Sequence, residues 1–408
     1  MSTKPELLIP AGSLTKIKIA YAYGADAVYV GASGLSMRPD QTCLSVEELA
    51  TALNIAHQQE KKLYVAINSL MFEADCAHLE DWLETTSHLD FDAVIVADFG
   101  ALSLVRQKRP DLNIHASTQL STANAHAVNL LASLGIQRVN MARECSLADI
   151  KNIAQKTSLE LEVFVHGAMC MAVSGRCLLS AHLCGESASQ GRCKHTCRWD
   201  WQLVESKRPG LTLPVFETSK ETIFLGSKDL CMIEHIPELV KSSISALKVE
   251  GRMKGEYYIA SVTRVYRAAL DAYFNNPAQY LADPNWLVEL TNISHRDYET
   301  GFFFGYPYRD LKALQTNSTV KATYQVLAFI ETIDNDWYTI ATRNPFSVSD
   351  DLEWFAPNMQ NGHIAIDTII DSQEQKCDKV ISGASYKVRF KDHPTRLPLW
   401  SFLHKKRP

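Results

Sequence analysis

The 408-residue sequence lacks any apolar run of the roughly 18 residues needed to cross a bilayer. Its start, MSTKPELLIPAG, lacks the basic stretch and apolar core of a secretory leader. The net charge is −5, so the chain lacks the overall basic character of many nucleic-acid binders, and any RNA contact would need a local patch. We therefore expect a cytoplasmic protein without a membrane segment.

Several catalytic signatures are also missing. The sequence contains no H-E-x-x-H zinc-protease helix, no G-x-S-x-G nucleophile elbow and no G-x-x-x-x-G-K-[ST] or G-x-G-x-x-G phosphate-binding loop. A cysteine–histidine protease could be composed from Cys170 and His166, but these two residues are only close in sequence. The residues therefore give no specific support to hydrolase or nucleotide-binding chemistry.

Short apolar runs alternate with amphipathic stretches over the first 250 residues. An example of the stretches is Ser45–Gln59, which has Val46, Leu49 and Leu53 at helical spacing and Ser45 as a candidate N-cap. Eight runs suit parallel strands buried on both faces: Leu7–Pro10, Ala27–Val30, Leu63–Ile67, Ala93–Ala97, Ile114–Ala116, Arg138–Met141, Leu161–Val165 and Ile244–Val249. The alternation predicts an α/β fold, a TIM-type (β/α)8 barrel, with a doubly wound open sheet as the alternative.

Polar residues follow the predicted strands, where a barrel of this kind carries its chemistry. They are Asn68, Asp98, Ser117, Gln119, Arg143, Glu144, His166, Glu250 and Arg252. The alternative for each is a helix cap or a structural ion pair, and Glu250 and Arg252 could simply pair with each other.

Composition changes divide the chain. We expect the barrel in residues 1–275, including a Cys-rich segment at 166–224, then a helical linker region at 276–318 and a small β-barrel domain at 319–408. The strands expected in the last domain are Tyr324–Glu331, Trp337–Ala341, His363–Ile370 and Tyr386–Phe390. The basic tail His404–Arg407 is expected to be a solvated end.

Five of the ten cysteines lie between positions 170 and 197, which indicates a metal or cluster site rather than scattered thiols. Cys170, Cys177, Cys193 and Cys197 are separated by six, fifteen and three residues. Four thiolates can hold zinc or a 4Fe–4S cluster. Only the last two cysteines are as close as in a zinc knuckle, which favours the cluster. Cys184 or Cys231 could replace one of the four ligands.

Several blocks of sequence are together typical of one family. The run EVFVHGAMC at Glu162–Cys170 is followed by Gly175, Cys177, Leu179 and Ser180. Further blocks are Pro10-Ala11-Gly12, Gly24–Tyr29, Lys248–Arg252 and Ser294–Arg296. Over nearly its whole length the chain resembles peptidase family U32.

Within this family the chain is most similar to a branch that hydroxylates the wobble uridine of certain tRNAs without oxygen. The resemblance implies a 4Fe–4S cluster on Cys170, Cys177, Cys193 and Cys197, prephenate as oxygen donor and the tRNA anticodon region as partner. Relatives that hydroxylate ubiquinone precursors share the cysteines matching Cys177, Cys193 and Cys197 and work as heterodimers, so a related partner subunit is a further implication. The family's peptidase and collagenase label, and a cluster-bearing subunit without its own active site, are the alternatives.

Site roles follow from this chemistry. Prephenate is a dianion, so its pocket needs cationic groups. We expect catalytic roles for Arg143, His166 and Glu250, and substrate-binding roles for Asn68, Gln119, Lys248 and Arg252. Trp199, Trp201 and His195, interleaved with basic residues, are candidates for stacking on a splayed anticodon base, with core packing as the alternative. The segment between Cys197 and Gly226 is shorter than in that branch, and Gly226 replaces its usual Asn.

Overall fold

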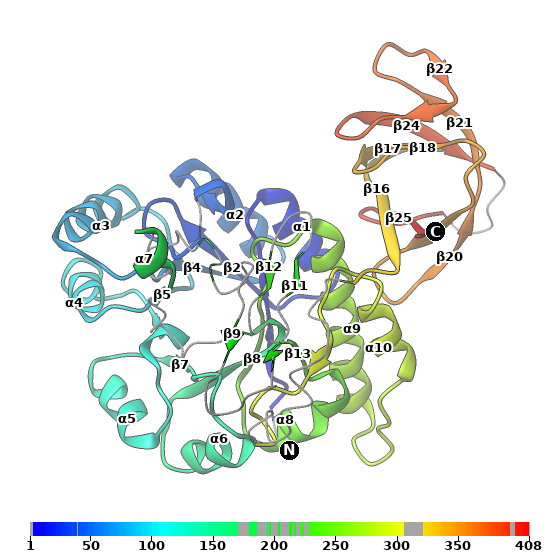
Figure 1. The fold of residues 1–408 in the computed structure, drawn as a ribbon. Helices are drawn as coiled ribbons and strands as arrows, with labels where there is room; N and C mark the ends of the chain where they lie inside the picture. Colours follow the sequence, from blue (N-terminus) through cyan, green and yellow to red (C-terminus); the bar gives the residue numbers. More distant parts are fainter. Residues whose placement is uncertain are drawn as a thin grey trace.

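We analysed a computed structural model of the chain. It describes residues 3–38, 40–169, 179–185, 194, 196, 203–204, 212–213, 216–217, 222–223, 228–305, 321–391 and 396–407. Figure 1 shows the barrel as the larger lobe and the C-terminal β domain as a smaller one beside α9. Among the described residues, none of the helices combines the length and apolarity needed to cross a bilayer.

Eight parallel strands close into a barrel because the last, β14, pairs with both the first and the seventh. The strands are β1 (Glu6–Pro10), β2 (Ala27–Ala32), β4 (Lys62–Ile67), β5 (Ala93–Val96), β6 (Ile114–Ala116), β7 (Arg138–Asn140), β8 (Glu160–Ala168) and β14 (Ala246–Val249). Each of the eight apolar runs in the sequence corresponds to one of them. The predicted TIM-type barrel is therefore confirmed, and the open sheet is excluded.

Helices cover the outside of the barrel (Figure 1). They are α1 (Leu14–Ala22), α2 (Val46–His57), α3 (Glu73–Thr85), α4 (Phe99–Lys108), α5 (Ala125–Ser133), α6 (Leu147–Ala154), α8 (Ile236–Lys241) and α9 (Glu256–Asn275). The expected helix at Ser45–Gln59 is α2, and Ser45 caps it: its hydroxyl accepts from the Glu48 N–H while the Glu48 carboxylate accepts from the Ser45 N–H.

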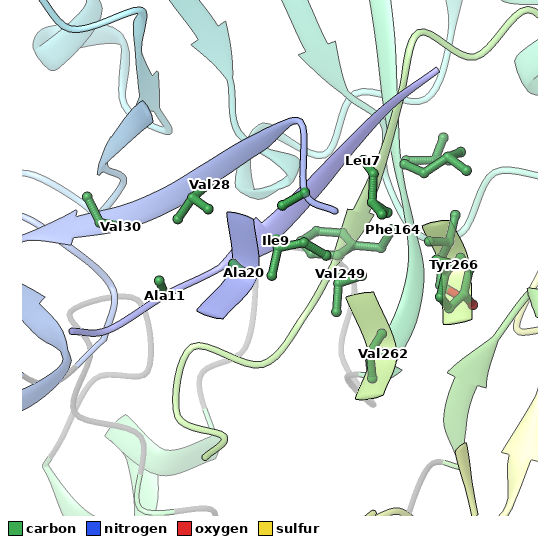
Figure 2. Close-up of a cluster of buried hydrophobic side chains, with 14 of the residues drawn as sticks. Leu7, Ile9, Ala11, Ala20, Val28, Val30, Phe164, Val249, Val262 and Tyr266 are labelled. Atoms are coloured by element: carbon green, nitrogen blue, oxygen red, sulfur yellow. The ribbon is translucent and has the colours of Figure 1, made fainter. Parts of the chain in front are cut away.

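The main hydrophobic core lies between the strands and these helices. In Figure 2, Leu7 and Ile9 of β1 and Val249 of β14 gather with Val262 and Tyr266 of α9. All five are almost inaccessible to solvent. Burial of this apolar layer supplies the main driving force that holds the helices on the barrel.

The inside of the barrel is instead rich in charge. Glu6, Arg138, Glu162 and Lys248 are inward-facing residues of four strands, and they form a chain of buried ion pairs. Nζ of Lys248 lies 2.7 Å from Oε1 of Glu162, and Nη1 of Arg138 lies 3.6 Å from Oε2 of the same carboxylate. Glu162 and Arg138 each contact two opposite charges, so the four buried charges balance one another as a group.

The Cys-rich segment begins and ends at one place in the barrel. β8 runs on to Ala168, and β13 (Asp229–Cys231) returns antiparallel to it, with Asp229 opposite Ala168 and Cys231 opposite His166. Short described elements lie between them: α7 (Leu179–Cys184), β9 (Leu203–Val204), β10 (Thr212–Leu213), β11 (Phe216–Glu217) and β12 (Thr222–Ile223). The segment is therefore anchored at the carboxyl end of a barrel strand, where active sites of this fold lie.

The expected all-β C-terminal domain is confirmed, after α10 (Pro284–Leu290) and β15 (Tyr298–Glu299). Its strands are β16 (Tyr324–Asp334), β17 (Trp337–Thr342), β18 (Phe346–Ser347), β19 (Leu352–Phe355), β20 (Asn361–Ile364), β21 (Ile366–Ile370), β22 (Lys376–Cys377), β23 (Lys379–Val380), β24 (Ser385–Phe390) and β25 (Phe402–Lys406). Eight of them form an antiparallel sheet in the order β20-β19-β25-β16-β17-β24-β21-β22.

The expectation of a solvated tail at His404–Arg407 is wrong. β25 lies inside the sheet between β19 and β16, and His404 is buried against Tyr257 and Tyr324. The basic residues hid the strand because Lys406 and Arg407 at its end reach solvent, although the preceding residues, up to His404, are buried.

An aromatic contact joins the two lobes. Tyr23 and Tyr257 from the barrel helices pack against Phe355 and Phe402 of the β domain, with ring centroids 5.3–6.2 Å apart. Arg264 of α9 lies over the Phe355 ring and donates to the carbonyl of Ala356. These contacts fix the β domain on the α1–α9 side of the barrel.

Candidate functional site

A pocket opens at the carboxyl ends of the barrel strands. We call it the arginine pocket because Arg38, Arg143 and Arg252 line it. The other lining residues are Tyr29, Met37, Asn68, Ile95, Ser117, Thr118, Gln119, Asn140, Phe164, Lys248 and Glu250. Six of the seven side chains expected to be catalytic or substrate-binding therefore meet in one place.

Glu250 is held as a carboxylate in this pocket. Nη2 of Arg38 donates to its Oε1 at 2.7 Å, and Nη2 of Arg143 lies 3.8 Å from its Oε2. Burial would raise the pKa of Glu250, but the two guanidinium groups outweigh it and lower the pKa to about 2. Glu250 is therefore an acceptor and a counter-charge, not a proton donor.

Arg252 does not pair with Glu250. Its Nη2 donates to the Ser36 hydroxyl at 2.7 Å, and that hydroxyl lies 3.3 Å from Oδ1 of Asn68. Its Nη1 is buried without a hydrogen-bond partner among the described residues. A side chain that is only 3% exposed and keeps an unused donor is suited to an anion that enters the pocket.

Arg143 is fixed from two sides. Its guanidinium lies 4.2 Å from the centre of the Phe164 ring, and its Nη1 donates to the carbonyl of Ala168. Ala168 is the last residue of β8, two positions before Cys170. Arg143 therefore links the arginine pocket to the start of the Cys-rich segment.

Lys248 lies at the inner end of the pocket. Nζ donates to Glu162 and lies 4.4 Å from the centre of the Tyr29 ring. Burial lowers its pKa, although the neighbouring Glu162 carboxylate opposes this.

His166 is separated from the pocket. Pairing between β8 and β14 slips between Lys248 and Val249, so that Phe164 faces Lys248 but His166 faces Val249. Simple alternation would have put His166 on the same face as Glu162 and Phe164, but the bulge turns it outward. Its ring packs among Tyr258, Tyr266 and Tyr298, and burial lowers its pKa to about 3.

Cys170, Cys177, Cys193 and Cys197 lie outside the described residues, as do Trp199, Trp201 and His195. Residues beside them are described. The hydroxyl of Ser180 accepts from the N–H of Lys194 at 3.0 Å, which ties the helix after Cys177 to the residue after Cys193. Cys231, considered as a substitute ligand, is buried, and burial raises its pKa to about 12, so without a bound metal it is a neutral thiol.

Sequence reasoning missed Arg38. It lies on the loop between β2 and α2, six residues beyond the end of its strand, and no spacing rule assigns it to the site. The charges did not reveal it either, because Glu250 had a candidate partner in Arg252, and only the structure shows that Arg252 bonds to Ser36 instead.

The arginine pocket adjoins a close backbone contact. Gly167 has φ +106°, and a Cβ atom there would lie 2.6 Å from the carbonyl oxygen of Glu250. Glycine is the residue that tolerates both conditions. The strand that leads to the cysteines and the segment from Lys248 to Glu250 can thus approach each other.

Comparison with known proteins agrees with this architecture. The model of peptidase family U32 matches residues 12–313, and that of the U32 C-terminal domain matches residues 322–398. A Bacillus subtilis protein named tRNA hydroxylation protein P1 is 35% identical over 380 residues, covering 93% of this chain and 90% of that protein.

Two further relatives differ in name. The Escherichia coli tRNA hydroxylation protein P is 34% identical, covering 87% of this chain and 86% of that protein. An uncharacterized protease of Methanocaldococcus jannaschii is 38% identical, covering 74% of each chain. Both family models, and the similarity to the Bacillus subtilis protein over most of both chains, show that the chain belongs to peptidase family U32.

Proposed function

We propose that the protein is a tRNA-modifying redox enzyme, which hydroxylates the wobble uridine at carbon 5 without oxygen, in the cytoplasm. The observation that carries the proposal is the arginine pocket beside the start of the Cys-rich segment. Relatives named tRNA hydroxylation protein, similar over most of their length, support the substrate class.

We assign a 4Fe–4S cluster to Cys170, Cys177, Cys193 and Cys197. Four thiolates are the donor set that such a cluster takes. The bond from Lys194 to Ser180 supports the assignment, because it ties the chain near Cys193 to the chain near Cys177. When bound, the cluster would supply one-electron transfer to the chemistry beside it.

The arginine pocket would hold the oxygen donor, for which we propose prephenate. Its lining carries three guanidinium groups and one ionised carboxylate, a net charge of two positive, while Lys248 is balanced by Glu162. A dianion would neutralise this excess. We assign its carboxylates to Arg252, which has an unused donor, and to Arg38 and Arg143, with Asn68 and Gln119 as polar neighbours.

The pocket must open for such a ligand. Its cavity volume is about 50 Å³, room for a few water molecules. Arg38 is the most exposed of the three arginines, at 33% of its side chain, against 12% for Arg143. We therefore propose that Arg38 moves outward to admit the donor and then closes on it.

A peptidase is the second candidate, favoured by the names of some relatives. Cysteine hydrolases need a thiol of low pKa beside a base. Cys145 and Cys231 are buried, and burial raises the pKa of each to about 12. Among the described residues these thiols thus do not support a nucleophile. The third candidate, a cluster-bearing partner of another subunit, would predict that the isolated chain is inactive.

The proposal is tested by anaerobic purification with iron, sulfide and zinc analysis, for the wild type and for Cys→Ala variants at the four positions. We expect about four irons and four sulfides per chain, reduced in every variant, and loss of hydroxylated wobble uridine from the tRNA of a deletion strain. One zinc without sulfide would contradict the redox mechanism. Casein or gelatin cleavage that survives iron chelation would support the peptidase.

A further inference from the structure

Several side chains that line the arginine pocket carry polar hydrogens, but they differ in whether they can transfer a proton to a substrate. Arginine does not release its proton in proteins, so Arg38, Arg143 and Arg252 act only as fixed charges. Glu250 has already lost its proton, because its pKa is about 2. Tyr29 donates its hydroxyl to the carbonyl of Val249 at 2.9 Å, and burial raises its pKa well above the ordinary value.

This leaves one amine. We propose that Lys248 is the general acid of the arginine pocket, delivering a proton to negative charge that forms on the bound substrate. The inference rests on the proposed function, since it assigns a role within that reaction. It is carried by the position of Lys248 in the pocket lining and by its pairing with Glu162.

The Lys248 ammonium has more N–H donors than hydrogen bonds among the described residues. Lys248 carries three N–H donors, and Glu162 is the hydrogen-bond partner of Nζ among the described residues. On another side, Nζ lies over the Tyr29 ring, at 4.4 Å, and more distantly over Phe164, at 5.5 Å. Both rings line the pocket, so the amine lies at the boundary between the pocket and the barrel interior.

The surroundings also tolerate the neutral amine. If Lys248 loses its proton, the Glu162 carboxylate remains buried but is not left alone, because Nη1 of Arg138 lies 3.6 Å from its other oxygen. Arg138 in turn contacts Glu6. A buried lysine with a single carboxylate neighbour would be locked in its charged form, whereas this second cation permits both forms.

The charged and titratable groups around the amine come from six strands. They are Glu162 on β8, Arg138 on β7, Tyr29 on β2, His115 on β6, Glu6 on β1 through Arg138, and Glu250, which follows β14. Burial is the largest influence on Lys248 and favours the neutral amine, with Arg138 acting in the same direction. Glu162 and Glu250 act in the opposite direction and favour the charged form.

The proton transfer is balanced. An N–H bond of the ammonium breaks, and an O–H or C–H bond forms on an oxyanion or carbanion of the substrate. Lys248 becomes a neutral amine, no electrons leave or enter, and the proton is replaced from water after product release. General acids of this kind contribute about 100-fold to 10,000-fold to rate.

The test uses the full-length, cluster-loaded protein in anaerobic single turnovers on tRNA. Lys248→Arg keeps the charge and the Glu162 partner but cannot release a proton. We expect unchanged iron content and tRNA binding, a rate at least about 100-fold lower, and loss of the decline that wild type shows as pH rises through the lysine pKa. Lys62→Arg is the matched control: Lys62 is also a strand lysine paired with a glutamate, 3.2 Å away, but more than half exposed.

A second variant guards against misfolding. Lys248→Ala opens space, and small primary ammonium ions should restore rate to it in proportion to their protonated concentration. Independently of turnover, NMR of ¹⁵N-labelled lysine amines should show Lys248 titrating below the ordinary lysine value.

The outcomes distinguish a failure of the Lys248 proposal from a failure of the proposed function. An active wild type with an equally active Lys248→Arg overturns the inference and leaves the proposed function intact. An inactive wild type contradicts the proposed function, and the NMR titration then tests Lys248 alone. A pKa of Lys248 at or above the ordinary lysine value would overturn its role as an acid.

Discussion

Arg38 and Glu250 are 212 positions apart, and Nη2 of the arginine lies 2.7 Å from Oε1 of the glutamate. Arg38 comes from the loop after β2, while Glu250 directly follows β14. Only closure of the barrel brings these two loops together, since β1 separates the two strands and pairs with both. The pair fixes the ionisation state of the site's central carboxylate, and its consequences can be measured.

The first prediction concerns acid stability. The pKa of Glu250 is lowered to about 2, whereas an unfolded glutamate has a pKa near 4.3. A lowered pKa stabilises the fold above the unfolded value, and that stability is lost as pH falls toward 2. Glu250→Gln should therefore cost up to about 3 kcal/mol at pH 7. In urea unfolding, its difference from wild type should shrink below about pH 4.3.

Asp367→Asn is the control for this experiment. Asp367 also pairs with an arginine, Arg389, but both side chains are over a third exposed. Its effect should be small at all pH values, because solvent screens an exposed ion pair. A Glu250→Gln effect as small as this, or one that does not change with pH, would contradict the buried ion pair.

The second prediction concerns donor binding. Arg252→Met removes the guanidinium with the unused buried donor but keeps a similar apolar stem. Hydrogen bonds to charged groups contribute about 1.5–3 kcal/mol, so calorimetry should show prephenate binding weakened about 10-fold to 100-fold. Arg252→Lys should recover part of the loss, because it restores charge without the fork geometry.

Arg389→Met, in the β domain, should bind prephenate like wild type. Equal binding by Arg252→Met and wild type would mean that the dianion does not reach Arg252. Loss of folded protein in Arg252→Met would instead identify Arg252 as a structural residue.

These residues also show how much of the fold and of the site can be predicted from the sequence. The eight strands were predictable because both of their faces are buried, which leaves uninterrupted apolar runs such as Ala93–Val96. Lys248 and Arg252 were predictable as site residues because they lie at or just after a strand end. Arg38 was not, since a loop residue six positions beyond its strand has no periodicity to place it.

The remaining differences have local causes. β25 was missed because its polar residues suggested an exposed tail, although the strand is central in its sheet. His166 was expected at the site because it directly follows the predicted strand Leu161–Val165, but a bulge turns it outward, and no pattern in this sequence announces that one-residue irregularity. Both failures arise where tertiary pairing overrides local pattern.

The third prediction concerns cluster retention. In Ser180→Ala the N–H of Lys194 loses its acceptor, which costs about 1 kcal/mol or somewhat more for a buried site. If the cysteines hold a cluster, the variant should lose iron to a chelator several-fold faster than wild type. Ser133→Ala is the control, since that hydroxyl only donates to a carbonyl within its own exposed helix end. Equal rates of iron loss would show that this bond does not support the ligands.

The last prediction concerns His166. The fold favours the neutral form of His166 but the charged form of Glu250, and in both cases the lowered pKa makes stability fall as pH falls. Its pKa is lowered to about 3 by burial among three tyrosines, whereas an unfolded histidine has a pKa near 6.5. Below pH 6.5 the unfolded chain takes up a proton that the folded chain refuses, so stability is lost as pH falls. Between pH 6.5 and 5 the loss should be about 2 kcal/mol.

His166→Asn should remove this contribution, so denaturant unfolding of the variant should depend less on pH over that window, whatever its overall stability. His363→Asn, at a side chain 71% exposed, should leave the pH dependence unchanged. The distinction bears on mechanism, because a residue that stays neutral down to pH 3 can accept a hydrogen bond but cannot act as an acid near neutrality. A variant with the wild-type pH dependence would mean that His166 does become protonated in the folded protein, and its expected catalytic role would then regain support.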